Sequence, residues 1–159
     1  MADVHDFNED LEYSSTYDAL FNECYTAIFP DIQDIVHVDI ALQRKGIDKE
    51  LIFKDRVHLY VEEKTRKKVW PDILLERWSS EKRPGWIITS EADLFAYLFA
   101  PIQKICLFDM KLLKAAWENN EEQWISTYFK SEALNYNYTT IGYCIPLKVL
   151  FLAVESEKC

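Results

Sequence analysis

The chain has 159 residues, of which 49% are hydrophobic, and its formal net charge is -9. No apolar run approaches the roughly 18 residues of a membrane span, and the opening MADVHDFNED is acidic where a secretory signal would be basic and then apolar. We therefore expect a cytoplasmic protein with no membrane partner, folded as a single domain over residues 1–159.

The predicted elements follow a mixed α/β order. The acidic N-terminal segment, about residues 1–34, contains SSTYDALFNECYTAIFP, which predicts a helix that begins at Ser15, with Asp18 at capping-box spacing, and that Pro30 ends. IVHVDIALQ is ambiguous between strand and helix. After Pro71, ILLERWSS and GWIITS are short β-like runs. DLFAYLFAPIQKICLFD predicts two strands, MKLLKAAWENNEEQWISTYF a helix, and TTIGYCI a strand before a last helix.

Charge is distributed unevenly along these elements. Residues 1–39 contain ten Asp and Glu and no Lys or Arg, whereas residues 44–83 contain twelve Lys and Arg against eight acids. The overall charge argues against a nucleic-acid partner, but a local basic face can still bind a polyanion. A solvated surface without any partner is the alternative interpretation of the same basic residues.

The stretch GIDKELIFKDRVHLYVEEKTR, residues 46–66, predicts a β-hairpin. Period-2 alternation places Glu62 and Lys64 on one face of the second strand, together with His58 and Tyr60, and the apolar Val57, Leu59 and Val61 on the other. A three-residue loop over 54–56 sets a register in which Asp48 faces Glu62.

Two opposed carboxylates are destabilising unless a positive charge lies between them. Mg²⁺ or Mn²⁺ would resolve the conflict, because these ions prefer oxygen ligands of the kind that Asp48, Glu62 and the backbone carbonyl of Glu63 offer. Lys64 lies on the Glu62 face, where it could orient or help deprotonate an attacking water.

Thirteen residues separate Asp48 from Glu62, and one separates Glu62 from Lys64. This spacing resembles the PD-(D/E)xK nuclease superfamily. The segments QRKGIDK, VEEKTR, WPDILLERWSS, GWI and NYTTIGYCIPLKVL resemble in particular a group of small endonuclease-like proteins of phages and mobile elements, over about residues 43–152. The resemblance implies an α/β (α+β) fold with a restriction-endonuclease-like core, in which a central mixed β-sheet is flanked by helices. It also implies a metal-dependent endonuclease that hydrolyses phosphodiester bonds, in DNA above all.

The same resemblance assigns roles to residues. Asp48 and Glu62 are implied as metal ligands and Lys64 as the catalytic lysine, with Gln43 beside the site. Ile47 stands where the superfamily pattern has proline, and this changes no ligand. Some relatives complete the metal site with an acid from a helix, and Glu23, at the edge of the first helix's apolar stripe, is the candidate for that position.

Further residues are candidates on weaker grounds. His58 shares the Glu62 face but is more typical of a structural histidine. Asp39 is the rival first acid, which we expect to be structural or peripheral. Asp72 and Glu76 offer a second acidic contribution or a solvated strand face. The basic candidates for binding nucleic acid are Arg66, Lys67, Lys68 and Arg77, with Lys82 and Arg83 beyond them and tryptophans interleaved.

A second class of function remains open from the sequence. A non-catalytic module with a nuclease-like fold could use its acidic N-terminal region to engage a basic protein surface, as a mimic of nucleic acid. The net charge favours this hypothesis, and the complete set of Asp48, Glu62 and Lys64 disfavours it. A homodimer is compatible with either hypothesis.

Overall fold

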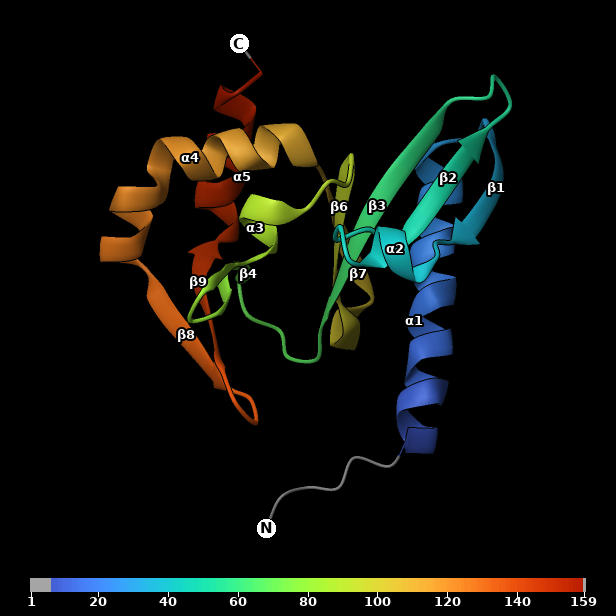
Figure 1. The fold of residues 1–159 in the computed structure, drawn as a ribbon. Coiled ribbons are helices and arrows are strands. Elements are labelled where there is room, and N and C mark those ends of the chain that lie inside the picture. Colours follow the sequence, from blue (N-terminus) through green and yellow to red (C-terminus); the bar gives the residue numbers. More distant parts are fainter. Residues whose placement is uncertain (1–6, 159) are drawn as a thin grey trace.

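The computed structural model describes residues 7–158, with side chains from residue 16 onward, and shows two β-sheets with helices around them (Figure 1). Sheet A has the strand order β1-β2-β3-β6-β7, and sheet B has the order β5-β4-β9-β8. The strands are β1 (Ile32–His37), β2 (Lys49–Phe53), β3 (His58–Arg66), β4 (Asp72–Ser80), β5 (Arg83–Pro84), β6 (Leu94–Phe99), β7 (Lys104–Asp109), β8 (Phe129–Leu134) and β9 (Thr139–Pro146). The helices are α1 (Phe7–Ile28), α2 (Ile40–Gln43), α3 (Trp86–Thr89), α4 (Met110–Thr127) and α5 (Leu147–Ser156), with a 3₁₀ turn, η1 (Ala100–Ile102).

Sheet A is mixed, because β3 and β6 run parallel while its other neighbouring strands are antiparallel. The segment between these parallel strands contains β4, β5 and α3, and both of these strands belong to sheet B. The predicted class, α+β with a mixed central sheet flanked by helices, is confirmed. Among the described residues, no helix combines the length and the apolarity that crossing a membrane requires.

The predicted hairpin is formed by β2 and β3. Leu51 faces Leu59 and Lys49 faces Val61, as the predicted register requires. Phe53 N–H donates to the Val57 carbonyl at 2.9 Å, which closes the three-residue loop. Arg56, the last loop residue, has a φ of 66°, as expected for the left-handed position that ends such a loop.

Two apolar cores lie on opposite faces of sheet A. Helix α1 covers one face, where Phe21 and Tyr25 pack against Leu51 and Val61. The other face packs through Phe95 and its neighbours against sheet B, α3, α4 and α5. Strand β6 is buried on both faces, which explains its almost uninterrupted apolar sequence LFAYLF.

Two local predictions were wrong. Helix α1 begins at Phe7 rather than at Ser15, so Ser15 lies inside the helix and is not its cap. GWIITS forms the short helix α3 instead of a strand. Gly85 passes so close to β4 that a Cβ there would lie 2.2 Å from the Glu76 carbonyl oxygen, and the turn at this glycine directs Trp86 into the core.

The ambiguous stretch IVHVDIALQ contains both kinds of element, because β1 ends at His37 and α2 begins at Ile40. Asp39 stands between them as the N-cap of α2, and its carboxylate accepts a hydrogen bond from Leu42 N–H at 3.0 Å. The rival first acid therefore has a structural role.

Candidate functional site

Strand β3 carries acidic side chains on both of its faces. Alternation turns Val61 and Glu63 toward α1, and it turns Glu62 and Lys64 toward the side of the sheet that packs on α3 and sheet B. The two sets of side chains are therefore separated by the sheet itself, and we refer to them as the Glu63 face and the Glu62 face.

The Glu62 face has a buried carboxylate that lacks a full set of partners. Glu62 is 2% exposed, and its Oε1 lies 3.1 Å from Lys64 Nζ. Its Oε2 is buried and has no hydrogen-bond partner among the residues that the structure describes. Burial raises the pKa of Glu62, although the Lys64 ammonium acts in the opposite direction. A buried, unsatisfied acceptor costs about 1–3 kcal/mol, and more when it is charged, so a cation or a hydrogen-bond donor placed at this oxygen would remove that cost.

Ser90 joins the Glu62 face to neighbouring segments. Its hydroxyl donates to the Gly46 carbonyl at 3.0 Å, and its proximity to the Glu62 carboxyl group lowers the pKa of that group. Gly46 has a φ of 73°, and a Cβ there would lie 3.0 Å from Ser90 Oγ. Lys114 of α4 donates to the Ser90 carbonyl. Ser90 therefore fixes the loop before Asp48 against β3 and α4.

Lys64 lies between two acids at the open side of this face. Its side chain is 42% exposed and pairs with Glu62. Burial raises the pKa of Glu76 on β4, and the positive charge of Lys64 partly opposes that shift. The Lys64 ammonium is thus accessible to solvent and yet held close to two carboxyl groups, on β3 and β4.

Asp48 lies where the regular hairpin pairing ends. The ladder stops at Lys49 and Val61, and Asp48 N–H donates to the Val61 carbonyl at 2.8 Å. The Asp48 Oδ2 accepts a hydrogen bond from Glu63 N–H at 2.6 Å. The Asp48 carboxylate therefore lies beside the backbone of β3, and its negative charge contributes to raising the pKa of both Glu62 and Glu63.

The Glu63 face already contains its own cation. Lys49 is 1% exposed, and its Nζ lies 2.7 Å from Asp18 Oδ1 and 3.0 Å from Glu63 Oε1. It also donates to Asn22 Oδ1 at 2.8 Å, while the Tyr25 hydroxyl donates to Glu63 at 2.7 Å. Each acid on this face therefore has a positive or hydrogen-bonding partner within the protein.

A cavity of about 290 Å³ opens beside this cluster. Asp48 and Gln43 line it together with Asp18, His37 and Glu63. Gln43 Nε2 donates to the Val38 carbonyl at 3.1 Å, and His37 Nε2 lies 3.1 Å from Asp18 Oδ1. The structure thus places Gln43 beside Asp48, with Glu63 rather than Glu62 as the acid that shares their cavity.

Two predicted site residues lie away from both acidic clusters. Glu23 is exposed on α1, whose sheet-facing side carries Asp18 and Asn22 instead. His58 pairs with Glu50 at the exposed end of the hairpin. Neither residue contacts Glu62 or Asp48.

The four basic residues predicted to bind nucleic acid lie on β3, on β4 and on the segment between these strands. Arg66 donates to the backbone carbonyl of Asp72 at 2.9 Å and also contacts its carboxylate. Arg77 Nε lies 2.6 Å from Glu121 Oε1, and its guanidinium stacks on Trp78 at 4.2 Å. Lys67 and Lys68 are exposed on the segment between β3 and β4.

Sequence reasoning missed Asp18, Lys49 and Ser90 as members of these clusters. A signal for Asp18 was present, because Asp18, Asn22 and Tyr25 follow helical spacing and share one face of α1. Lys49 lies two residues before Leu51 on β2, so alternation predicts that the two side chains share the apolar face. No sequence spacing connects Ser90 with Glu62, because α3 lies far along the chain from β3.

No three His, Cys, Asp or Glu side chains converge as a metal-binding group within residues 7–158. Mg²⁺ is usually bound through one or two carboxylates and keeps several waters, so the oxygen donors of Asp48 and Glu62 are of the kind that it takes, although Asp48 lines the cavity that it shares with Glu63. The unpartnered Glu62 Oε2 is the observation that fits such an ion. Comparison with protein-family models, curated proteins and solved structures gave no match to this chain.

Proposed function

We propose that the protein is a metal-dependent endonuclease with a PD-(D/E)xK-type core, acting in the cytoplasm on phosphodiester bonds of DNA with Mg²⁺ or Mn²⁺. The observation that carries the proposal is the buried Glu62 carboxylate, which has one unpartnered oxygen and a solvent-accessible lysine 3.1 Å from the other. Asp48, the residue before β2, would supply the second carboxylate by turning away from the cavity that it shares with Glu63.

The proposal rests on the Glu62 face because the Glu63 face has no need of a metal. Lys49 already neutralises Asp18 and Glu63 at hydrogen-bonding distance. A divalent ion there would have to displace a buried ammonium from its partners. On the Glu62 face, by contrast, an added cation would satisfy an oxygen that the protein leaves without a donor.

The chemistry follows from the groups that surround Glu62. A bound divalent ion supplies charge that polarises a phosphate and lowers the pKa of a water molecule. Asp48, Glu62 and the Glu63 carbonyl would hold the ion. The Lys64 ammonium, fixed by Glu62, orients the attacking water and stabilises the negative charge that develops on the phosphate oxygens.

The test is cleavage of plasmid, linear, single-stranded and branched DNA with Mg²⁺ or Mn²⁺ and with EDTA. We expect cleavage only with the divalent ion, and a loss of about 100-fold or more in Glu62→Gln and in Lys64→Ala. Glu132→Gln and Lys104→Ala, which change exposed residues on β8 and β7, are the matched controls and should keep full activity. Cleavage that persists in EDTA, or full activity in both site variants, would contradict the proposal.

The second candidate is a non-catalytic module that binds a basic protein surface. It is favoured by the ten acids and the lack of basic residues in positions 1–39, which include α1. The same DNA panel distinguishes the two functions. A module of this kind would cleave none of the substrates, and Mn²⁺ would leave its melting temperature unchanged.

A further inference from the structure

Two turns meet at one end of sheet B. One connects β4 to β5, and the other connects β8 to β9. Glu81 Oε1 accepts a hydrogen bond from Thr139 N–H at 2.9 Å, and Thr140 Oγ1 donates to the Ser79 carbonyl at 3.2 Å. These bonds join the turns, so their side chains keep a fixed arrangement relative to each other.

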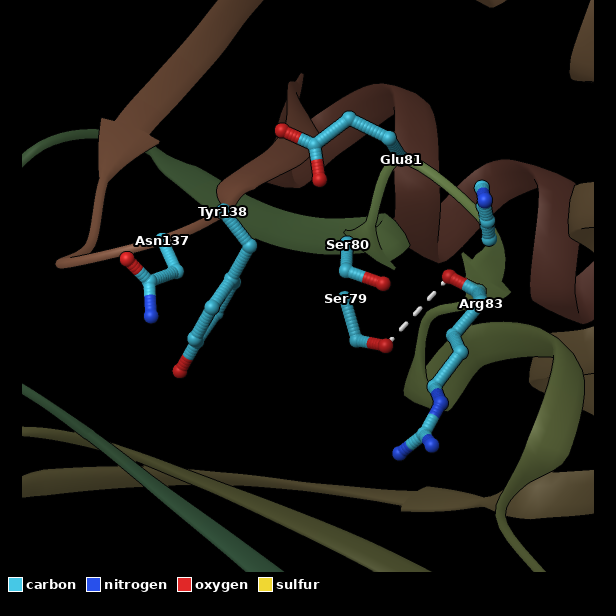
Figure 2. A pocket seen from close by; sticks show the side chains of 7 residues that line it. Ser79, Ser80, Glu81, Arg83, Asn137 and Tyr138 are labelled. Atoms are coloured by element: carbon cyan, nitrogen blue, oxygen red, sulfur yellow. Dashed lines mark hydrogen bonds between the residues drawn. The ribbon is translucent and has the colours of Figure 1, made fainter.

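A hollow of about 560 Å³ lies between the two turns. In Figure 2, Tyr138 and Arg83 extend in the same direction on either side of Ser79. The Glu81 carboxylate, which accepts the hydrogen bond from Thr139 N–H, lies on the opposite side of the view from the Arg83 guanidinium. The open part of the hollow is therefore framed by an aromatic ring, a guanidinium and hydroxyl groups.

The β8–β9 turn exposes large rings to water. Tyr136 is 97% exposed and Tyr138 is 46% exposed. Each ring has an accessible π-face, and stacking on such faces is how proteins bind unstacked bases without regard to their sequence. A duplex offers far fewer such faces, because its bases are stacked on one another.

The β4–β5 turn supplies positive charge next to these rings. Neither Lys82 nor Arg83 forms an ion pair with any residue that the structure describes. Both line the hollow together with Ser80 and Asn137, whose hydroxyl and amide groups can donate hydrogen bonds to a phosphate. Exposed lysine and arginine beside exposed tyrosine is a combination that suits a nucleic-acid strand.

We propose that this hollow binds single-stranded nucleic acid, with phosphates on Lys82 and Arg83 and a base stacked on Tyr138, while a further base stacks on the exposed Tyr136 of the same turn. The choice of ligand rests on the proposed endonuclease function, since the same strand β4 connects the hollow to the candidate site. Glu76, whose pKa the charge of Lys64 affects, lies three residues before Ser79. That is about 10 Å along a strand, so one nucleic-acid strand can contact both places.

The test is binding of a short fluorescent oligothymidylate, followed by fluorescence anisotropy in EDTA so that cleavage cannot intervene. We expect the parent to bind the single strand more tightly than a duplex of the same length. Replacing both rings, in Tyr136→Ala with Tyr138→Ala, should weaken binding of the single strand by about tenfold per ring. The matched variant with Tyr136→Phe and Tyr138→Phe keeps both rings and should bind as the parent does.

Charge is tested separately. Lys82→Ala with Arg83→Ala should reduce the slope of log affinity against log salt by about 0.7 for each lost phosphate contact, whereas Lys104→Ala on β7 should leave it unchanged. Unchanged affinity in the Tyr-to-Ala variant, or a duplex preferred over the single strand, would overturn the inference. Cleavage without binding at the hollow would overturn this inference alone, and binding without any metal-dependent cleavage would overturn the endonuclease alone.

Discussion

The two faces of β3 carry similar side chains in different electrostatic conditions. On the Glu63 face, a fully buried lysine lies between Asp18 and Glu63, and Tyr25 and Asn22 complete its surroundings. On the Glu62 face, the lysine is partly exposed, and one carboxylate oxygen has no hydrogen-bond partner in the part of the chain that the structure describes. The charge cluster on the Glu63 face is satisfied within the protein and stabilises the fold. The cluster on the Glu62 face is incomplete, and an incomplete cluster is what a ligand site is expected to have.

The largest expected difference between the faces concerns stability. Lys49→Met removes a buried cation and leaves Asp18 and Glu63 without it, so it should reduce the free energy of unfolding by about 3–5 kcal/mol. Lys64→Met removes a lysine that is 42% exposed but leaves the buried Glu62 carboxyl group without this partner, so it should reduce the free energy of unfolding by about 1–3 kcal/mol, less than Lys49→Met does. Urea unfolding followed by tryptophan fluorescence measures both. Equal losses in the two variants would mean that the faces do not differ as described.

A smaller effect distinguishes the faces by metal binding. Mn²⁺ at ten times its dissociation constant should stabilise the parent by about 1.4 kcal/mol, which is a rise of a few degrees in melting temperature. Glu62→Gln should lose this rise. Glu63→Gln should keep it, because its backbone carbonyl remains, and so should the N-cap variant Asp39→Asn. A rise that depends on Glu63 and not on Glu62 would move the metal to the α1 side of the sheet.

The smallest effects are opposite responses to pH in EDTA. Burial raises the pKa of Glu62 above its ordinary value of 4.5. The contribution of the neutral carboxyl group to stability is therefore present below pH 4.5 and is lost as the pH rises through the folded-state pKa. Glu62→Gln should therefore be more stable than the parent at neutral pH and equal to it in acid. Burial acts to raise the pKa of Asp18, but Lys49 lowers it below 3.8. The stability that the ionised Asp18 carboxylate contributes is therefore present at neutral pH and is lost in acid.

Asp18→Asn should accordingly destabilise the protein at neutral pH, and the difference from the parent should shrink below pH 3.8. Thermal melts of the parent and both variants across this pH range measure the two responses together. The same sign of change in both variants would remove the distinction between the faces.

The hairpin was the part of the fold that the sequence predicted best. Its register follows from two local constraints, the length of the loop and the alternation of Leu51, Leu59 and Val61, and both act over a few residues. The pairing of Glu62 with Lys64 follows from the same alternation. Such features depend little on the rest of the chain.

The misses have a common physical cause, which is that they depend on tertiary contacts. Alternation no longer applies at Asp48, because regular pairing ends at Lys49, and so its carboxylate turns to Glu63 N–H. The rotation of α1 is set by packing of Phe21 and Tyr25, which brings Asp18 rather than Glu23 to the sheet. The local sequence of GWIITS favours a strand, and the close approach of Gly85 to β4 overrides it.

The interleaving of the two sheets also has a consequence for the order in which the protein can be made. Sheet A uses only residues up to Asp109, so a ribosome that has released this segment has supplied every strand of that sheet. Strand β4 is synthesised early but pairs with β9, whose first residue is Thr139. Until β9 emerges, the backbone at Ile73 and Leu75 has no partner strand on that side. The nascent chain therefore exposes an unpaired strand edge, which can misassociate, for the synthesis of about 70 residues.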